Sequence, residues 1–172
     1  TAHHPLSALR LLITARDSPN PRVQTLAAVL RVNVRENLGD RRGAMRDAVE
    51  NLALTEERND QWMAAASRME IGSLHGQVGN FDSALENYSK AIELLNEIGS
   101  EQDSMQARGY VVAALIGAGR IEQARAEFAD LSDGWQPSDP DPQLHPEVSA
   151  GILIAAAELE VYDQSTTSAA NL

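Results

Sequence analysis

Apolar residues recur every three or four positions along most of the chain, the spacing that places them on one face of an α-helix. The clearest series consists of Phe81, Ala84, Leu85, Tyr88, Ala91, Ile92, Leu95 and Ile98. Such series predict seven helices, at about 5–17, 22–38, 41–58, 61–78, 81–98, 101–118 and 121–131, and an eighth at about 147–161. Residues 132–146 hold four of the seven prolines, so an exposed loop is expected there.

The helices repeat in pairs with a period of 40 residues. Each of the glycines Gly39, Gly79 and Gly119 is followed five residues later by an alanine (Ala44, Ala84, Ala124) and nine residues later by Ala48, Tyr88 or Phe128. A glycine at a helix end takes a positive φ at little cost and turns the chain. The alanine lets the next helix approach closely, and the larger residue one turn later fills the space between pairs.

These offsets resemble the tetratricopeptide repeat. The middle copy matches best, with Ile71-Gly72, His75, Gly79, Phe81, Ala84, Tyr88 and Ala91-Ile92 at the family's spacing. Arg68 and Arg108 stand where the family often has Trp, and the period is 40 residues instead of 34. Units of this length are similar to those in the sensor ends of bacterial transcription regulators of the MalT-like and antibiotic-regulatory types.

The resemblance implies an all-α fold, a right-handed superhelical stack of antiparallel helix hairpins. A HEAT-like helical array is the structural alternative, but it would not explain the Gly–aromatic–Ala offsets. One domain is expected over residues 1–172, with repeats at about 22–60, 61–100 and 101–140 and partial units at 1–21 and 141–172. Both ends are expected to continue in a larger protein.

Composition agrees with closely packed helices, because only 4% of the residues are aromatic and the core must rest on small aliphatic side chains. The absence of cysteine excludes a disulfide scaffold and a Cys-based zinc site, and it favours the cytoplasm. No apolar run approaches the roughly 20 residues of a membrane-spanning helix, so no membrane partner is expected.

Charge is unevenly distributed along the chain, whose net charge is −11. Residues 1–60 hold nine Lys and Arg against eight Asp and Glu, whereas residues 61–172 hold five against seventeen. An acidic surface repels phosphate backbones, so no direct contact with nucleic acid is expected. The acidic face either keeps the domain in solution or meets a basic partner.

Candidate catalytic and metal-binding residues are few. The four histidines (His3, His4, His75 and His145) are not spaced to converge, and a metal site needs at least three ligands. No phosphate loop, nucleophile elbow or HExxH motif is present. The sequence therefore predicts no enzyme activity, no metal and no cofactor. Arg31 and Arg35, one turn apart, are expected to pair with Glu36 or Asp40, with an acidic group of a ligand as the alternative.

The predicted binding surface comes from the resemblance, since in such arrays the first helix of each pair lines an inner groove. The residues expected to face it are Asn33, Glu36, Asn37, Met69, Ser73, Gln77, Gln106 and Ala113. Gaps at Gly76, Gly109 and Gly117 would admit a partner's backbone. Trp62 is expected to pack inward, while Trp135 either binds a partner or caps the last pair.

The predicted function is a non-enzymatic module that binds a protein, a peptide or a small effector through this groove, as the regulatory or sensor part of a bacterial transcription regulator. The alternative is a structural array that associates with itself, for example as a homodimer, since solenoid ends without polar caps expose apolar faces.

Overall fold

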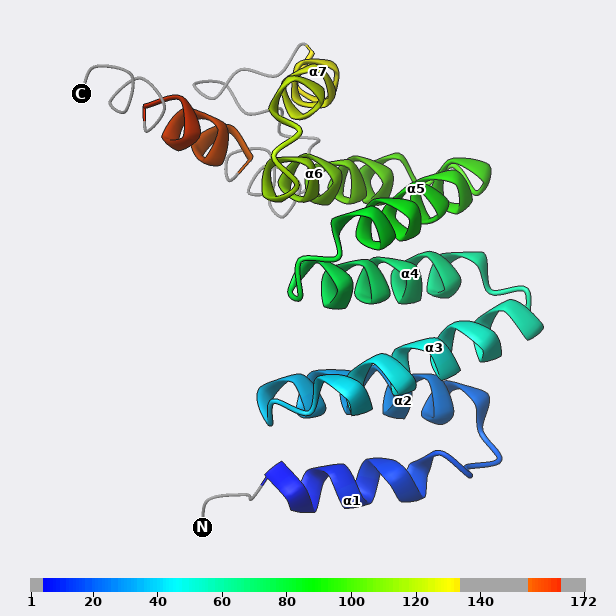
Figure 1. The fold of residues 1–172 in the computed structure, drawn as a ribbon. Helices are drawn as coiled ribbons and strands as arrows, with labels where there is room; N and C mark the ends of the chain where they lie inside the picture. The colour runs from blue at the N-terminus through cyan, green and yellow to red at the C-terminus, as the bar shows by residue number, and fades with distance from the viewer. Residues whose placement is uncertain (1–4, 134–154, 165–172) are drawn as a thin grey trace.

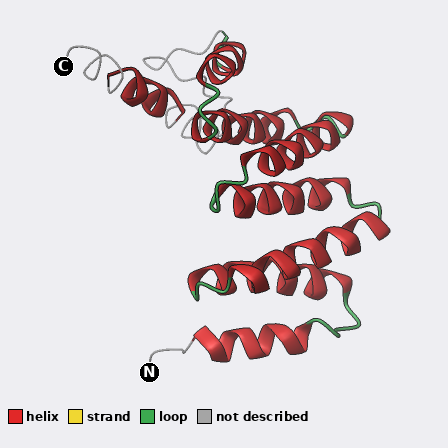
Figure 2. Cartoon of the chain, viewed as in Figure 1, coloured by secondary structure: helices red, strands yellow, loops and turns green. Residues whose placement is uncertain are grey.

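The computed structural model describes residues 5–133 and 155–164. Its helices are α1 (Pro5–Ala15), α2 (Pro21–Asn37), α3 (Arg41–Glu57), α4 (Gln61–Gly76), α5 (Phe81–Glu97), α6 (Glu101–Gly117) and α7 (Ile121–Leu131). Residues 155–164 are also helical. The expected all-α fold is confirmed (Figure 2), and the seven predicted helices match the observed bounds to within two residues. Residues 134–154, which include Trp135, His145 and part of the expected eighth helix, lie outside the described residues, as do His3 and His4.

The helices stack in chain order, each antiparallel to the next (Figure 1). Every helix from α1 to α7 packs against its sequence neighbour, and α4 also touches α6. Side-chain hydrogen bonds link α2 to Gln77 at the end of α4, and α4 to α6. The first helices of successive pairs therefore meet on one side, and we call the side formed by α2, α4 and α6 the inner face.

Five turns share one geometry at intervals of 20 residues. Positive φ angles occur at Gly39, Asn59, Gly79, Gly99 and Gly119. In the first turn the Gly39 amide donates to the Glu36 carbonyl and the Asp40 amide donates to the Arg35 carbonyl, each at 2.8 Å. This pair of bonds is the Schellman motif, and it recurs in the other four turns. The 40-residue repeat of the sequence is thus two helical units of equal length.

The repeated small and aromatic positions lie where the offsets predict. Ala44, Ala84 and Ala124 are fully buried, which permits the close approach of neighbouring helices. Tyr88 is 5% exposed, and its ring stacks on Tyr110 of α6 with a centroid distance of 5.7 Å. The Tyr88 side chain therefore fills the space between one helix pair and the next.

Two glycines inside helices make room for aromatic rings. A Cβ on Gly72 of α4 would lie 2.6 Å from the Tyr88 ring, and one on Gly117 of α6 would lie 2.5 Å from the Phe81 ring. The expectation that Gly117 leaves a gap for a partner is therefore wrong, because the Phe81 ring occupies that space. Gly76 has no such neighbour within 4 Å.

We expect Gly72→Ala to lower the free energy of unfolding by about 1–3 kcal/mol, because the methyl group overpacks the contact with the Tyr88 ring. Gly76→Ala is the matched control in the same helix. It should leave stability unchanged or raise it by up to about 1 kcal/mol, since alanine favours helix and finds open space. Urea unfolding followed by circular dichroism measures both. Equal stabilities of the two variants would contradict this packing of α4 on α5.

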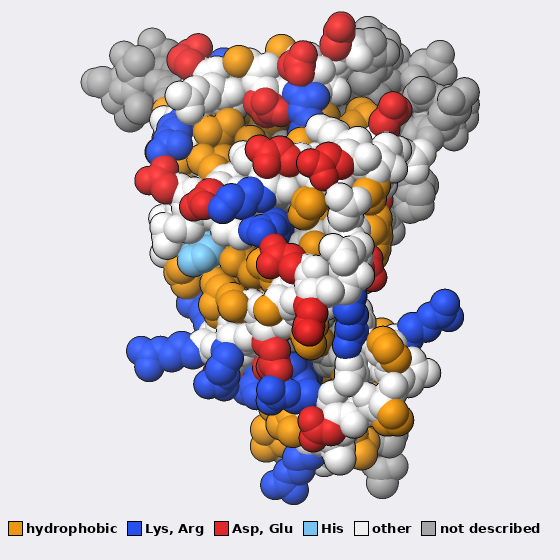
Figure 3. Space-filling model, turned by 90° about the vertical axis from the view of Figure 1, so that its right-hand side faces the viewer, with side chains coloured by type: hydrophobic (Ala, Val, Ile, Leu, Met, Phe, Trp, Pro, Cys, Tyr) orange, Lys and Arg blue, Asp and Glu red, His pale blue; other side chains and the backbone are white. Residues whose placement is uncertain are grey.

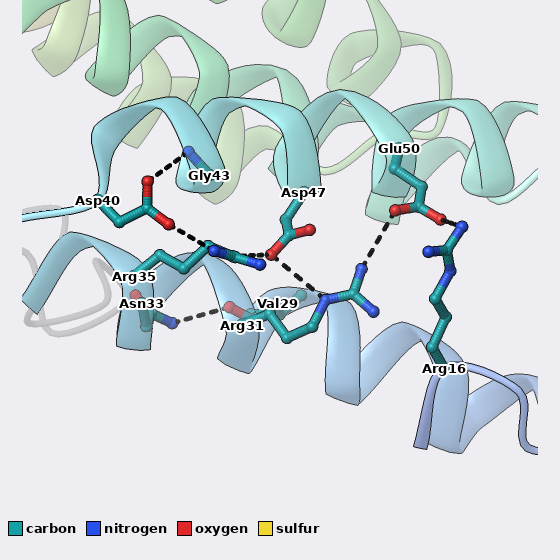
Figure 4. Close-up of polar contacts among 9 residues, drawn as sticks. All are labelled: Arg16, Val29, Arg31, Asn33, Arg35, Asp40, Gly43, Asp47 and Glu50. Atoms are coloured by element: carbon teal, nitrogen blue, oxygen red, sulfur yellow. Dashed lines mark hydrogen bonds and ion pairs between the residues drawn. The ribbon is translucent and has the colours of Figure 1, made fainter. Parts of the chain in front are cut away.

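A buried network of charged side chains joins α2 to α3 (Figure 4). Arg31 is 2% exposed, and its Nε lies 3.4 Å from Oδ2 of the buried Asp47. Arg35 donates to the same oxygen at 2.6 Å and contacts Asp40 at 2.5 Å. Of the two expected partners, Glu36 and Asp40, only Asp40 is observed, and it pairs with Arg35. Glu50 continues the network to Arg31 and, at 2.5 Å, to Arg16, which follows α1.

The pKa values of Arg35 and Asp40 shift in the directions that favour their charged forms. Burial disfavours the charged form of Arg35, but its hydrogen bonds to Asp47 and Asp40 outweigh burial and raise its pKa. The Gly43 amide and then the Arg35 guanidinium lower the pKa of Asp40. Each charge of the network thus faces an opposite charge, which favours a structural role over ligand binding. Arg31 Nε, at 3.4 Å from Asp47, makes no hydrogen bond within the described residues.

Candidate functional site

An apolar hollow of about 540 Å³ opens on the inner face between α2 and α4. Its lining consists of Pro21, Arg22, Thr25, Leu26 and Val29 from α2, Arg58 and Asp60 from the α3–α4 turn, and Trp62, Met63 and Ala66 from α4. Because the two helices are the first members of consecutive pairs, the hollow lies on the side of the stack where the resemblance implies a groove. None of the eight residues predicted for that groove lines it.

Large apolar side chains remain exposed in this hollow. Leu26 is 61% exposed and Trp62 is 48% exposed. The indole Nε1 of Trp62 donates to Asp103 Oδ2 on α6 at 2.7 Å, so the side chain links two helices while it stays exposed. The expectation that Trp62 packs inward is therefore wrong. Its polar N–H bridges to the next helix of the inner face, and such an aromatic side chain is suited to contact a partner.

The rim of the hollow contains two arginines with different roles. Arg58 Nη1 donates to the Pro21 carbonyl at 3.3 Å and to the Thr25 hydroxyl at 3.2 Å, which ties the α3–α4 turn to the start of α2. Arg22 is exposed and forms no ion pair with any residue that the structure describes. Arg58 therefore shapes the hollow, whereas Arg22 is left to solvent or to a ligand.

A smaller pocket of about 100 Å³ adjoins the hollow, and Val29, Met63 and Ala66 line both. Its remaining wall is formed by Val32, Ala48, Asn51, Ser67 and Glu70. We call it the polar pocket, because Asn51 and Ser67 are both buried and Glu70 is half-buried. It lies between α2, α3 and α4.

Glu70 at this pocket is paired with another carboxyl group, Glu36 of α2. Burial raises the pKa of Glu70 to about 7, with further contributions from its hydrogen bond to Glu36 and from charge repulsion. Glu36 also accepts a hydrogen bond of 2.8 Å from Gln77 Nε2. Glu36 and Gln77, both predicted site residues, are thus brought together, and Glu70 beside them is still partly protonated near neutral pH.

Sequence reasoning missed Glu70, although a signal for it exists. Glu70 precedes Ser73 by three positions and Gln77 by seven, the spacing of one helix face. Trp62, Leu26 and Asn51 were also missed as site residues. Leu26 stands one 40-residue period before Ala66, and both residues line the hollow. The repeat alone could therefore have placed Leu26 on the same face as Ala66.

The other predicted site residues are more scattered. Asn33 is exposed and donates to the Val29 carbonyl of its own helix (Figure 4). Asn37 is exposed at the end of α2, and Ser73, Gln106 and Ala113 are half-buried on α4 and α6. Met69 packs against two core clusters, one that contains Ala65 and one that contains Ala84. The groove composed of these eight residues stays a prediction.

A third depression, of about 330 Å³, lies among the ends of α3, α4 and α5, but much of its lining is charged. Arg68 and Glu56 there form an ion pair of 2.6 Å. Gln61 donates to Glu97 at 3.1 Å. Because several of its polar groups already bind one another, this depression is a weaker candidate than the apolar hollow.

The charged side chains separate along the stack. In Figure 3, Lys and Arg gather over the lower part, at the level of α2 and α3, and Asp and Glu lie mostly over the helices above. Among the described residues, no group of three His, Cys, Asp or Glu side chains could hold a metal ion. No helix in the described part of the chain is long and apolar enough to cross a membrane.

No protein-family model matches the sequence, and no curated protein matches it either. Several solved structures are similar to this chain, among them the following two. The first is a Signal Transduction ATPase with Numerous Domains (STAND) protein with a tetratricopeptide repeat sensor from Pyrococcus horikoshii, at 20% identity and a TM-score of 0.67 over 92% of this chain and 24% of that one. The second is BtubC from P. vanneervenii, at 14% identity and a TM-score of 0.64 over 95% of this chain and 69% of that one.

This chain thus spans about a quarter of the length of the STAND protein. At these identities the likeness concerns the fold alone. Taken with the sequential antiparallel packing of the described helices and their repeated turns, it shows that the chain has the fold of a tetratricopeptide-repeat array.

Proposed function

We propose that this chain is a non-catalytic binding module that holds a segment of a partner polypeptide in the hollow between α2 and α4. The observation that carries the proposal is the exposure of Leu26 and Trp62 within one concave surface. Apolar side chains gathered in a concavity are typical of binding sites, because a partner's side chain releases water from both surfaces.

A polypeptide segment suits this surface for two reasons. The hollow of about 540 Å³ accommodates apolar side chains, and Arg22 offers an unpaired cation at its rim for an acidic side chain of the partner. Polar groups farther along the inner face, including Asn33, Ser73 and Gln106, would then contact the partner's backbone. Such mixed surfaces accept an extended or helical segment through a few apolar anchors.

We infer further that the module is the sensor or partner-binding part of a larger signalling protein, such as a bacterial transcription regulator. This inference is supported by the similar STAND protein, whose tetratricopeptide repeats are described as a sensor. The 40-residue repeat period, which resembles that of regulator sensor regions, supports the same context.

Selection of randomised peptides displayed on phage against the purified chain tests the proposed site. We expect the enriched peptides to share an apolar residue and to lose affinity by about tenfold or more for Leu26→Glu, which places a charge inside the hollow. Val49→Glu is the matched control, because Val49 is an exposed apolar residue of α3 that does not line the hollow. It should leave affinity unchanged.

Two results would contradict the proposal. One is a failure to enrich any peptide, or enrichment of peptides that bind the Leu26→Glu variant as well as the wild type. The other comes from light scattering over a range of protein concentrations. A dimer that Leu26→Glu dissociates would assign the hollow to a second copy of the chain, which is the self-association alternative.

A further inference from the structure

We infer that the polar pocket formed by Asn51, Ser67 and Glu70 receives the ammonium group of a lysine side chain from the partner segment. This inference rests on the function proposed above, since the lysine belongs to the same segment whose apolar residue occupies the neighbouring hollow. Val29, Met63 and Ala66 line both cavities, so one segment can reach both.

The first argument is an unpaired acceptor in the pocket. Asn51 is 4% exposed, and its Nδ2 donates to the Ser67 hydroxyl at 2.9 Å. Ser67 in turn donates its proton to the Met63 carbonyl at 2.9 Å, so the Asn51 amide must present nitrogen to Ser67 and leave Oδ1 free. Oδ1 is buried without a hydrogen-bond partner among the described residues. Because buried acceptors are normally paired, this atom points to a ligand that donates.

The second argument is the carboxyl group of Glu70 in the same pocket. Glu70 forms no ion pair with a Lys or Arg of the described residues. The titratable groups near it are Glu36 on α2 and Tyr88 on α5, and Tyr88 stays neutral because burial raises its pKa to about 12, with smaller contributions from Tyr110 and Glu70. A cation would therefore meet a carboxylate and no competing positive charge.

The third argument is the shape and lining of the cavity. Besides the three polar residues, the cavity is lined by five apolar ones, Val29, Val32, Ala48, Met63 and Ala66. The four methylene groups of lysine can lie along such a wall while the ammonium group reaches acceptors at its end. A volume of about 100 Å³ is small, which favours a compact ammonium group with its three donors.

An acidic ligand would fail in this pocket, because the available groups accept hydrogen bonds and carry negative charge. The lysine must compete with the proton held by Glu70, whose pKa is raised to about 7 by burial and by Glu36. Below that pH the carboxyl group is mostly neutral and the cation loses its partner. Binding should therefore strengthen as the pH rises through about 7 and release part of a proton.

The test is a titration of the complete chain with n-butylammonium, followed by NMR at the Asn51 side-chain amide and the Glu70 carboxyl carbon. We expect both signals to shift and the pKa of Glu70 to fall in the presence of the ligand. The affinity should be about tenfold or more weaker at about pH 5.5 than at about pH 8. Uncharged n-butanol, which has the same stem, should not lower the Glu70 pKa.

Glu70→Gln should abolish binding of n-butylammonium, while Glu86→Gln, a change at an exposed carboxylate paired with Lys90, should leave it intact. Thermal unfolding by circular dichroism checks that both variants fold. Absence of any shift, or shifts that persist in Glu70→Gln, would mean that the pocket holds water only and would overturn the inference.

The peptides selected on the hollow separate this inference from the proposed function. If peptides that depend on Leu26 contain no lysine and bind Glu70→Gln as tightly as the wild type, the lysine inference is wrong while the proposed function stands. If no peptide is selected at all, the proposed function fails, and the lysine inference fails with it because it requires a bound partner segment.

Discussion

Replacing Asp47 by alanine should lower the free energy of unfolding by about 3–5 kcal/mol, because it removes the buried carboxylate between two arginines and leaves them only the more exposed Glu50 and Asp40. Asp47 Oδ2 lies 2.6 Å from Arg35 and 3.4 Å from Arg31, whose side chain is almost fully buried. Neither guanidinium can lose its proton near neutral pH, so the buried charge must remain or the helices must separate. Equilibrium unfolding in urea measures the loss.

The matched control is Asp130→Ala, which removes a carboxylate from Arg108 at an ion pair of 2.5 Å. The Asp130 side chain is 75% exposed and Arg108 keeps Glu127, so solvent and the second carboxylate compensate. The control should change stability little. Similar losses for the two variants would contradict a special role for the buried network between α2 and α3.

Replacing Tyr88 by alanine should also cost about 3–5 kcal/mol, the usual range for deleting a buried aromatic ring. The ring fills the space between Gly72 of α4 and Tyr110 of α6, so its loss leaves a cavity at the junction of two helix pairs. Gly72 has no side chain that could move in to fill the space. Thermal and urea unfolding of the variant measure the effect.

Tyr88→Phe separates the ring from its hydroxyl group and should retain stability to within about 1 kcal/mol, because the ring packing is unchanged. Phe128 occupies the corresponding place one repeat later but is only half-buried, so Phe128→Ala should cost less than Tyr88→Ala. A loss below about 1 kcal/mol for Tyr88→Ala would mean that the relative positions of α4, α5 and α6 are wrong.

The two proposed ligand contacts lie in adjoining cavities that share three apolar lining residues. Leu26 and Trp62 belong to the hollow, and Asn51 and Glu70 belong to the polar pocket, while Met63 borders both. A partner segment with an apolar residue near a lysine would use both cavities. The buried network around Asp47 keeps α2 and α3 together behind them, so it supports the site without touching the ligand.

The sequence by itself determined the helices, their pairing and the fold of the array. These features depend on neighbours within one or two turns, such as the apolar stripe of 81–98 and the glycine of each turn, and local spacing records them directly. The burial of Ala44, Ala84 and Ala124 is predicted by the same spacing, five residues after each turn glycine. The sequence predicts the break at residues 59–60, but not that Asn59 takes the positive φ that glycine takes in the other four turns.

Only the tertiary structure decided which side chains share a cavity. Glu36 and Glu70 come from different helix pairs, as do Trp62 and Asp103, and their meeting depends on how far one pair is rotated against the next. That rotation depends on contacts between pairs, such as Phe81 against Gly117 and Tyr88 against Tyr110, which helical periodicity does not encode. For the same reason the gap expected at Gly117 proved to be filled, and the half-exposed Trp62 and the free Asn51 oxygen became visible only in the folded chain.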